Sequence, residues 1–178
     1  MLVTCQLIGY VGRVANSSRW LSAGEQLLWR RWLRLNATLL GVLSRELQDA
    51  GLSLSDYQVL VKLTDTAEGR VRVTDLARDV NWERSRLSHH VTRMERRGLV
   101  QRTECHNDGR GAWVVLTSAG RSAIERAAPG HARAVRRLVF DGLSSEELTV
   151  MTTVINRVLS RVLAESDKGM NDETTELG

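Results

Sequence analysis

The stretch TDLARDVNWERSRLSHHVTRMERRGLV, residues 74–100, decides the fold of this chain. Its apolar residues recur at spacings of three and four on both sides of a break at Asn81 and Trp82, and this pattern predicts two short helices. We expect Thr74 to cap the first helix. The second spans roughly residues 84–97 and ends at the glycine that follows, a residue typical of helix C-termini.

A β-hairpin is predicted directly after these two helices. Residues 99–104 and 113–116 favour strands, and the glycine-containing segment 105–112 between them favours a turn. Upstream, residues 70–73 alternate polar and apolar side chains, which predicts a short half-buried strand. Two short helices joined by a tight turn and followed by a hairpin are typical of a winged helix-turn-helix.

Capping signals predict two helices before this motif. Ser22 with Glu25 is a capping box that opens a long amphipathic helix running to Gly51. Ser55 with Gln58 is a second box, which we expect to open the next helix.

Two more helices are predicted after the hairpin. Thr117 is expected to cap the first of them, and the adjacent Pro129 and Gly130 predict a break or kink within it. Ser144 with Glu147 is a third capping box, and it opens the last helix.

The predicted fold is therefore mainly α with a small β-hairpin wing, a winged helix-turn-helix domain joined to a helical dimerisation region. The first helix carries two apolar faces, which suits packing against its own domain and against a partner chain. The N-terminal segment lacks a basic region before its apolar residues, which indicates a flexible extension or a start codon assigned too far upstream. The expected boundaries are an extension over 1–21, a folded domain over 22–165 with dimerisation helices at about 22–50 and 118–165 and the winged helix-turn-helix at about 54–117, and a disordered acidic tail over 166–178.

Composition excludes several classes of protein. The chain has 178 residues, of which 42% are hydrophobic and 26% charged, which suits one folded domain. Its scarce aromatic residues predict a core of Leu, Val and Ala. No apolar stretch approaches the roughly 18 residues of a membrane-spanning helix, so no membrane partner is expected. Two cysteines, Cys5 and Cys105, exclude a disulfide-stapled scaffold and favour a reduced, cytoplasmic protein.

The second helix of the motif has a strongly basic surface. Residues 84–102 contain six arginines and one acidic residue, a net charge of +5. At about 100° per residue, Leu87, Val91 and Met94 form a narrow stripe for burial. The opposite side carries Ser85, Arg86, Ser88, His89, Thr92, Arg93 and Arg96, with no acid among them. Such hydroxyl, imidazole and guanidinium groups can contact base edges and phosphates, so the helix is predicted to bind DNA.

These residues resemble the MarR family of transcriptional regulators. The resemblance rests on the stretch 76–100, on Asp108-Gly109-Arg110 and on Val115-Leu116-Thr117. It implies an obligate homodimer whose recognition helices enter successive major grooves of an inverted-repeat operator, and a wing arginine, Arg110, in the minor groove, oriented by Asp108. Trp82 stands where the family has a small aliphatic residue, so base preference is not transferable. The predicted DNA-contacting residues are Thr74, Arg84, Ser85, Arg86, Ser88, His89, Arg93, Asp108 and Arg110.

The resemblance also implies control by a small aromatic or anionic effector, and the expected function is a ligand-responsive repressor. Trp29, Trp32 and Tyr57 lie on the elements that would line an effector cleft, and Arg30 could supply charge there. Core or interface packing is the alternative reading of these side chains.

Other functions are less well supported by the residues. Adjacent histidines such as His89 and His90 point about 100° apart on a helix, so neither a metal site nor a cofactor is predicted. Cys105 lies near Arg102, which leaves a redox-sensing regulator as one alternative. A winged-helix module that docks proteins is another. No nucleophile with an adjacent base and no phosphate-binding loop is visible, so the chain is not expected to be an enzyme.

Overall fold

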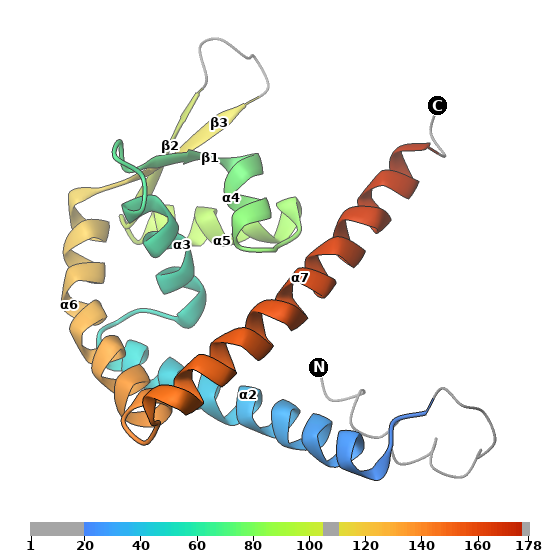
Figure 1. The fold of residues 1–178 in the computed structure, drawn as a ribbon. Coiled ribbons are helices and arrows are strands. Elements are labelled where there is room, and N and C mark those ends of the chain that lie inside the picture. Colours follow the sequence, from blue (N-terminus) through green and yellow to red (C-terminus); the bar gives the residue numbers. More distant parts are fainter. Residues whose placement is uncertain (1–19, 105–110, 176–178) are drawn as a thin grey trace. The chain divides into compact units, whose positions relative to one another are not determined.

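The computed structural model describes residues 20–104 and 111–175 (Figure 1). Its elements follow the predicted order, and the mainly helical fold with one small sheet confirms the predicted fold class. The elements are α2 (Ala23–Asp49), α3 (Leu54–Thr64), β1 (Arg70–Arg72), α4 (Val73–Asp79), α5 (Arg84–Arg96), β2 (Val100–Glu104), β3 (Ala112–Leu116), α6 (Ser118–Val135), the π-helix η1 (Arg136–Phe140) and α7 (Ser145–Thr175).

The chain divides into two units, one up to residue 41 and one from residue 42 onward. The first unit contains α2 up to that boundary, and the helix begins with the predicted capping box. The backbone N–H of Ser22 donates to Oε2 of Glu25 at 2.7 Å, and the N–H of Glu25 donates to the Ser22 hydroxyl at 3.3 Å. Trp29 and Trp32 on this segment are 43% and 46% exposed.

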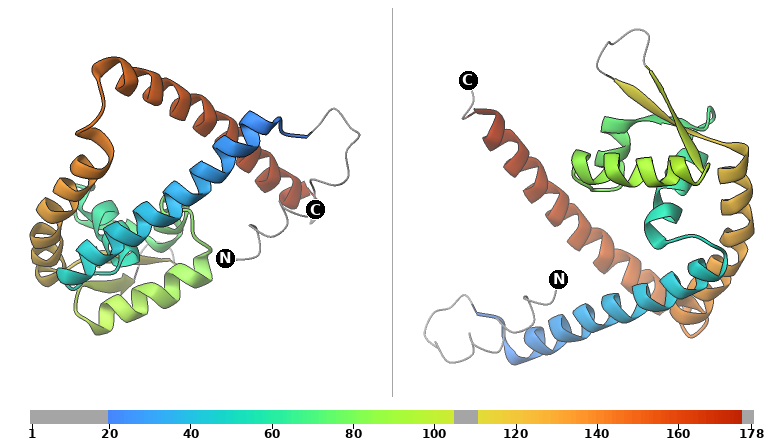
Figure 2. Two further views of the ribbon diagram at one scale, coloured as in Figure 1. Left: turned by 90° about the horizontal axis from the view of Figure 1, so that it is seen from below. Right: turned by 180° about the vertical axis from the view of Figure 1, so that it is seen from behind.

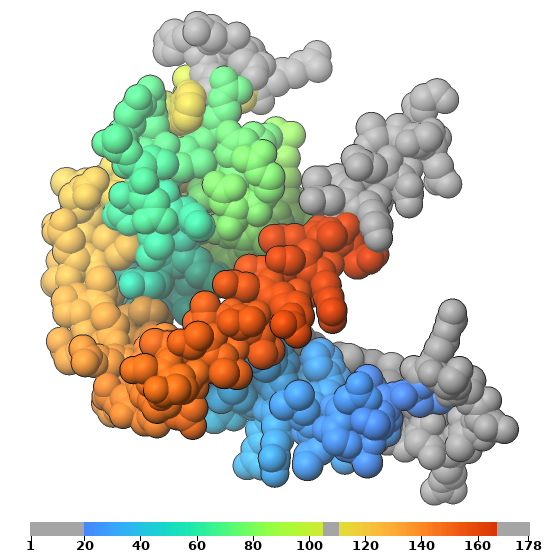
Figure 3. Space-filling view, viewed as in Figure 1, coloured from blue at the N-terminus to red at the C-terminus, as the bar shows by residue number. Residues whose placement is uncertain are grey.

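The second unit is built around an aliphatic core. Figure 3 shows α3, α4 and α6 packed in continuous contact over that core. Every buried hydrophobic residue described is Leu, Val, Ala, Ile or Met, which confirms the predicted aromatic-poor core. The most deeply buried side chains include Leu47, Leu52, Val59, Leu60, Leu63, Leu76, Leu87, Val91, Met94, Val100 and Val114.

The three strands form one antiparallel sheet in the order β1-β3-β2. Val71 pairs with Val114, which in turn pairs with Arg102 on the other side. Because Val114 is fully buried while its neighbours on the strand are half-buried, the sheet turns one face to the core. The right-hand view of Figure 2 shows β2 and β3 extending away from α5 as the predicted wing.

Two predicted helix starts are wrong. The second capping box is formed by Ser53 and Asp56, not by Ser55 and Gln58: Ser53 N–H donates to Oδ2 of Asp56 at 2.9 Å, and Asp56 N–H donates to the Ser53 hydroxyl at 3.0 Å. A shorter Asp side chain fulfils here the role expected of Gln. Thr74 is not an N-cap, because the strand pairing of β1 ends at Arg72 and α4 follows at once.

The predicted break at Pro129 is also wrong. The helix α6 continues through the proline to Val135. Ala127 and Ala134, on either side of it, are buried, and this packing holds the helix together across the lost hydrogen bond. The departure from α-helical geometry comes later, at η1, where the Asp141 N–H donates to the carbonyl of Arg136 at 2.9 Å.

The last helix begins as predicted and ends later than predicted. Ser144 and Glu147 form the expected capping box. The helix then continues past residue 165, where the sequence predicted a disordered tail, and reaches Thr175. Elongating an existing helix costs little compared with starting one, and no proline interrupts this segment. None of the helices in the described residues is long and apolar enough to cross a bilayer.

Candidate nucleic-acid interface

The turn between α4 and α5 fixes the helix-turn-helix. Asn81 adopts a positive φ of 53°, a left-handed conformation that asparagine tolerates better than most residues. The N–H of Trp82 donates to the carbonyl of Ala77 at 2.9 Å and closes the turn. The helix α5 therefore begins at Arg84, directly after a tight turn, as the sequence predicted.

The two faces of α5 differ as predicted. Leu87, Val91 and Met94 are fully buried. The remaining predicted face divides in two, because Ser88 and Thr92 are half-buried. The exposed members are Ser85, Arg86, His89, Arg93 and Arg96, and Arg84, which was also predicted to contact DNA, is exposed as well.

Trp82 supports one of the predicted base-contacting side chains. The guanidinium carbon of Arg86 lies 4.5 Å from the centre of the Trp82 ring, which is the geometry of a cation–π contact. The Trp82 ring in turn meets the His90 ring edge-on, with the ring centres 5.3 Å apart. The Trp82 ring is thus the surface against which the guanidinium of Arg86 packs.

Arg102, on β2, connects the wing to α5. Its guanidinium donates to the Ser88 carbonyl at 2.6 Å, to the Ser88 hydroxyl at 3.2 Å and to the Thr92 hydroxyl at 3.0 Å. Its backbone N–H donates to Oε1 of Glu95 at 2.9 Å. The sequence placed Arg102 in the basic patch and near Cys105, and did not predict these contacts with α5. The contacts show that Ser88, a predicted DNA contact, already has a partner within the protein.

A buried carboxylate anchors the other end of α5. Asp56 on α3 is 2% exposed, and its Oδ2 lies 2.7 Å from the guanidinium of Arg97. Burial alone would raise the pKa of this carboxyl, but hydrogen bonds from His90, then from the Ser53 backbone and Arg97, outweigh it and hold the pKa far below its usual range. Arg97 also donates to the Gly51 carbonyl at 2.7 Å. Arg97 is therefore an internal anchor, which the count of basic residues did not reveal.

The two adjacent histidines have different surroundings. His89 is exposed on the predicted DNA-binding face, whereas His90 is 7% exposed. The Nε2 of His90 lies 3.0 Å from Oδ1 of Asp56, and its Nδ1 lies 2.9 Å from the guanidinium of Arg93. Within the described residues no group of three metal-ligating side chains comes together.

The sheet adds basic groups beside a tryptophan. The guanidinium carbons of Arg70 and Arg72 lie 4.8 and 5.4 Å from the centre of the Trp113 ring. Arg70 also donates to Glu68 at 2.6 Å. The predicted contact Thr74 is exposed on α4. The predicted wing contacts Asp108 and Arg110, and the alternative redox residue Cys105, lie outside the described residues.

The predicted effector residues fall in both units. In the first unit, Arg30 donates to the Gln26 side chain at 3.3 Å and Trp29 and Trp32 are exposed. In the second unit, Tyr57 is half-buried and its ring lies 4.5 Å from that of His131. Burial raises the pKa of Tyr57 and lowers that of His131.

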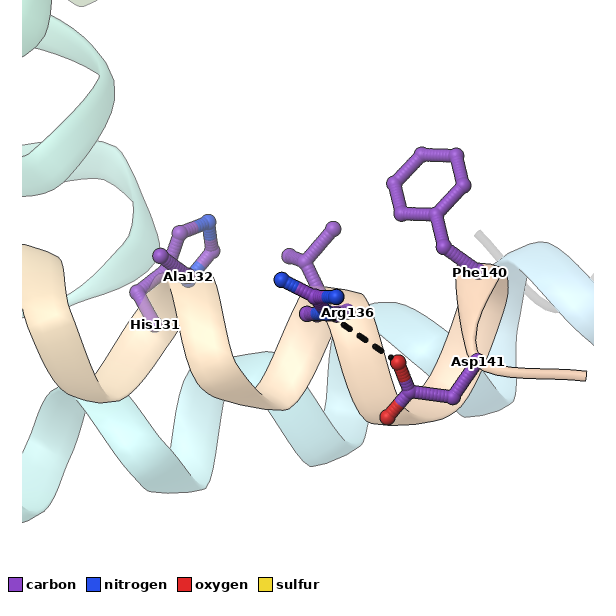
Figure 4. Close-up of a pocket in the computed structure, with 6 residues that line it drawn as sticks. His131, Ala132, Arg136, Phe140 and Asp141 are labelled. Carbon is purple, nitrogen blue, oxygen red and sulfur yellow. Dashed lines mark hydrogen bonds and ion pairs between the residues drawn. The ribbon is translucent and has the colours of Figure 1, made fainter.

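An open hollow lies beside this aromatic pair, at the junction of α6 and η1 (Figure 4). His131 lines one end, and its Nδ1 is buried without a hydrogen-bond partner. Arg136 pairs with Asp141 at 3.2 Å at the same hollow, next to Phe140. Sequence reasoning named Tyr57 and missed the residues of this hollow, because they are distributed over two helical turns without any recognisable motif.

Comparison with known proteins places this geometry in a family. A model of the MarR family matches residues 52–111, the region from α3 to the wing. The crystal structure of AbsC, a MarR family transcriptional regulator from Streptomyces coelicolor, is 38% identical, with a TM-score of 0.78 over 83% of this chain and 99% of AbsC. Sco3205, a MarR family regulator from the same organism solved in complex with DNA, is 42% identical, with a TM-score of 0.76 over 79% of this chain and 89% of that one.

A curated relative agrees with these structures. The HTH-type transcriptional repressor YetL of Bacillus subtilis is 23% identical over 147 residues, which are 83% of this chain and 87% of YetL. These relatives are transcriptional regulators and not enzymes, as the sequence predicted. Because the winged helix-turn-helix is accompanied by 38% identity over nearly the whole of AbsC, the chain belongs to the MarR family of transcriptional regulators.

Proposed function

We propose that this chain regulates transcription by binding an inverted repeat of double-stranded DNA as a homodimer, with α5 in the major groove. The observation that carries the proposal is the exposed face of α5, which presents Arg84, Arg86 and Arg93 with no acidic residue among them. A helix that needed only solubility would mix both signs of charge. That Sco3205 was crystallised with DNA supports this reading.

The wing and the start of α4 extend the proposed contact. Arg110, held by Asp108, would enter the minor groove, where the negative potential is strongest. Thr74, Ser85, Ser88 and His89 complete the proposed set. The Ser88 hydroxyl accepts from Arg102, so its own hydrogen would remain to donate to DNA. The winged helix-turn-helix at about 54–117 is the proposed DNA-binding part, and the protein would act in the cytoplasm, where its operator is accessible.

Uncovered apolar residues support the homodimer. On α7, Val154, Val158 and Val162 recur at spacings of four and are 51%, 48% and 55% exposed. An apolar stripe of this length on a helix is typical of an interface. We therefore assign dimerisation to the helices at about 22–50 and 118–165, with a second copy of the chain as the partner.

Control by a small aromatic or anionic effector is part of the proposal. Trp29, Arg30, Trp32 and Tyr57 remain its candidate residues, and the hollow beside His131 offers an unpartnered ring nitrogen and an aromatic side chain, Phe140. Salicylate should quench tryptophan emission saturably and weaken operator binding. An unchanged emission at millimolar salicylate would count against effector control.

Fluorescence anisotropy of the full-length protein tests DNA binding. The duplex comes from upstream of the gene for this protein, a scrambled duplex serves as the control, and each is titrated at several salt concentrations. Arg86→Ala should lower the affinity for the operator by about 10- to 100-fold and reduce the salt dependence.

Arg126→Ala is the matched control, because Arg126 is an exposed arginine outside the proposed interface with DNA. It lies on α6, within the proposed dimerisation helices, so sedimentation first has to show that this variant is still a dimer. It removes the same charge and should leave the affinity near that of the wild type. Equal losses in both variants would mean that only net charge matters and that α5 does not read the operator.

A further inference from the structure

The buried imidazole of His90 lies between two charged side chains on different elements. Its Nε2 lies 3.0 Å from Oδ1 of Asp56, which belongs to α3, but it has no hydrogen-bond partner among the described residues. Its Nδ1 lies 2.9 Å from the guanidinium of Arg93, one turn further along α5. His90 is buried, whereas Arg93 is exposed on the face proposed to read DNA.

The chemistry of these groups allows one arrangement of protons. A guanidinium only donates hydrogen bonds and stays protonated in proteins, so Nδ1 of His90 must accept from Arg93. On a neutral ring the proton is then on Nε2, the nitrogen that lies 3.0 Å from Oδ1 of Asp56. The carboxylate itself is held ionised by Arg97 on its other oxygen.

We propose that His90 is a positioning residue for Arg93. Asp56 fixes the tautomer and orientation of the ring, and the ring holds the guanidinium of Arg93 in one orientation before DNA arrives. A long flexible side chain that is ordered in advance loses less freedom on binding. The inference rests on the proposed function, because it gives Arg93 a DNA contact to make.

Other charged groups near His90 do not replace this role. Within the described residues, the guanidinium of Arg97 donates to Oδ2 of Asp56 and to the Gly51 carbonyl. The guanidinium of Arg86 lies over the Trp82 ring, which packs perpendicular to the His90 ring, and the contact of Arg86 is with the tryptophan. The acceptor at Nδ1 is therefore the feature that links the buried carboxylate to the DNA-binding face.

Two substitutions distinguish the role of Nδ1 of His90 from the role of Nε2. His90→Asn places an amide oxygen close to the position of Nδ1 and can still accept from Arg93, but it is too short to reach Asp56. His90→Gln can donate to Asp56 near the position of Nε2 but lacks an acceptor near Nδ1. His90→Gln should weaken operator binding by about five- to tenfold, and His90→Asn should restore most of the affinity.

A double-mutant cycle with Arg93→Ala shows whether the effect passes through Arg93. In the Arg93→Ala background, His90→Gln should cause no further loss. An equal loss in both backgrounds, in variants with wild-type melting temperatures, would overturn the positioning role. If Arg93→Ala binds as tightly as the wild type, the role is also overturned, while Arg86→Ala still tests DNA binding separately.

The ring can be observed directly if the variants fold poorly. Long-range ¹H–¹⁵N spectra of the ¹⁵N-labelled wild-type protein at about pH 8 report the tautomer of each neutral histidine. We expect the Nε2–H form for His90 and a shift of its Nδ1 resonance in Arg93→Ala. The Nδ1–H form would contradict the inference without any measurement on DNA.

Discussion

The helices α5 and α7 are both amphipathic, yet their apolar faces meet different surroundings. On α5, Leu87 and Val91 are fully buried by α3, α4 and the sheet of the same protomer. On α7, Val154 and Val158 occupy equivalent helical spacings and remain about half exposed at 51% and 48%. Periodicity identifies the face that will be covered, and the rest of the chain determines whether the same protomer covers it.

The polar faces differ as well. α5 is attached to its domain by charged contacts at both ends of its buried face, through Asp56 with Arg97 and through Arg102 with Ser88. The described part of α7 has mainly local bonds, such as Thr149 to the carbonyl of Ser145. We infer that the orientation of α5 is determined within one protomer, whereas that of α7 depends on the partner copy.

The largest expected effect comes from removing the buried anchor of α5. Asp56→Ala leaves His90 and Arg97 without their shared carboxylate, and it removes the side chain that accepts the Ser53 N–H in the capping box of α3. Breaking such a buried pair costs about 3 kcal/mol of unfolding free energy. Urea unfolding at neutral pH measures it. Asp75→Ala is the control, because that carboxylate makes only an exposed pair with Arg78 and should change stability by less than about 0.5 kcal/mol.

A charged substitution should disrupt the apolar face of α7. Val158→Glu would place a carboxylate from each copy in the proposed dimer interface, and should raise the dimer dissociation constant about 100-fold. Sedimentation of the full-length protein at several concentrations measures this. Asn156→Glu introduces the same residue about 160° around the helix from Val158, at an exposed position, and should leave the dimer intact. A dimer that survives Val158→Glu would exclude this face of α7 from the interface.

Much of the difference between α5 and α7 could be predicted from the sequence. The contacts that could not be predicted share a physical cause. The burial of Leu87 and the caps at Ser22 and Ser144 follow from local spacing. The pairing of Asp56 with Arg97 joins residues 41 positions apart. No local sequence pattern indicates such a contact, so Arg97 was predicted to belong to the basic patch.

The exposed arginines were easier to predict than their supports. The wheel of α5 placed Arg86 and Arg93 on the outer face, and the structure agrees. It did not place Trp82 beneath Arg86 or His90 beside Arg93, because a helical wheel describes one helix and omits what lies around it. The predicted break at Pro129 was wrong for a similar reason. Buried residues on both sides of the proline, Ala127 and Ala134, keep α6 continuous, and the local sequence does not show this packing.

Acid should remove the stabilisation that Asp56 gives to the attachment of α5. The pKa of Asp56 is lower in the folded chain than its unfolded value of about 3.9. A lowered folded pKa means that the carboxylate stabilises the fold above the unfolded pKa, and that this stabilisation disappears as pH falls from about 4 through the folded pKa. Urea unfolding between about pH 5 and pH 2.5 should show the loss in the wild type. Asp56→Asn should show a shallower decline, and parallel curves for both proteins would contradict the assignment.

The smallest expected effect concerns the ring beneath Arg86. Trp82→Leu keeps an apolar side chain in the turn but removes the aromatic face that lies 4.5 Å from the guanidinium. An exposed cation–π contact contributes about 0.5–1 kcal/mol, so operator affinity should fall roughly two- to fivefold. Anisotropy titrations of Trp82→Leu, Arg86→Ala and the double variant separate this support from general damage to the turn. If Trp82→Leu weakens binding equally with and without Arg86, the ring supports the turn and not the arginine. If the loss disappears in the Arg86→Ala background, Trp82 acts on DNA binding through Arg86. Individual side chains around α5 then position its DNA-binding residues, and in this α5 differs from α7. A helical wheel of α5 alone could not reveal this difference.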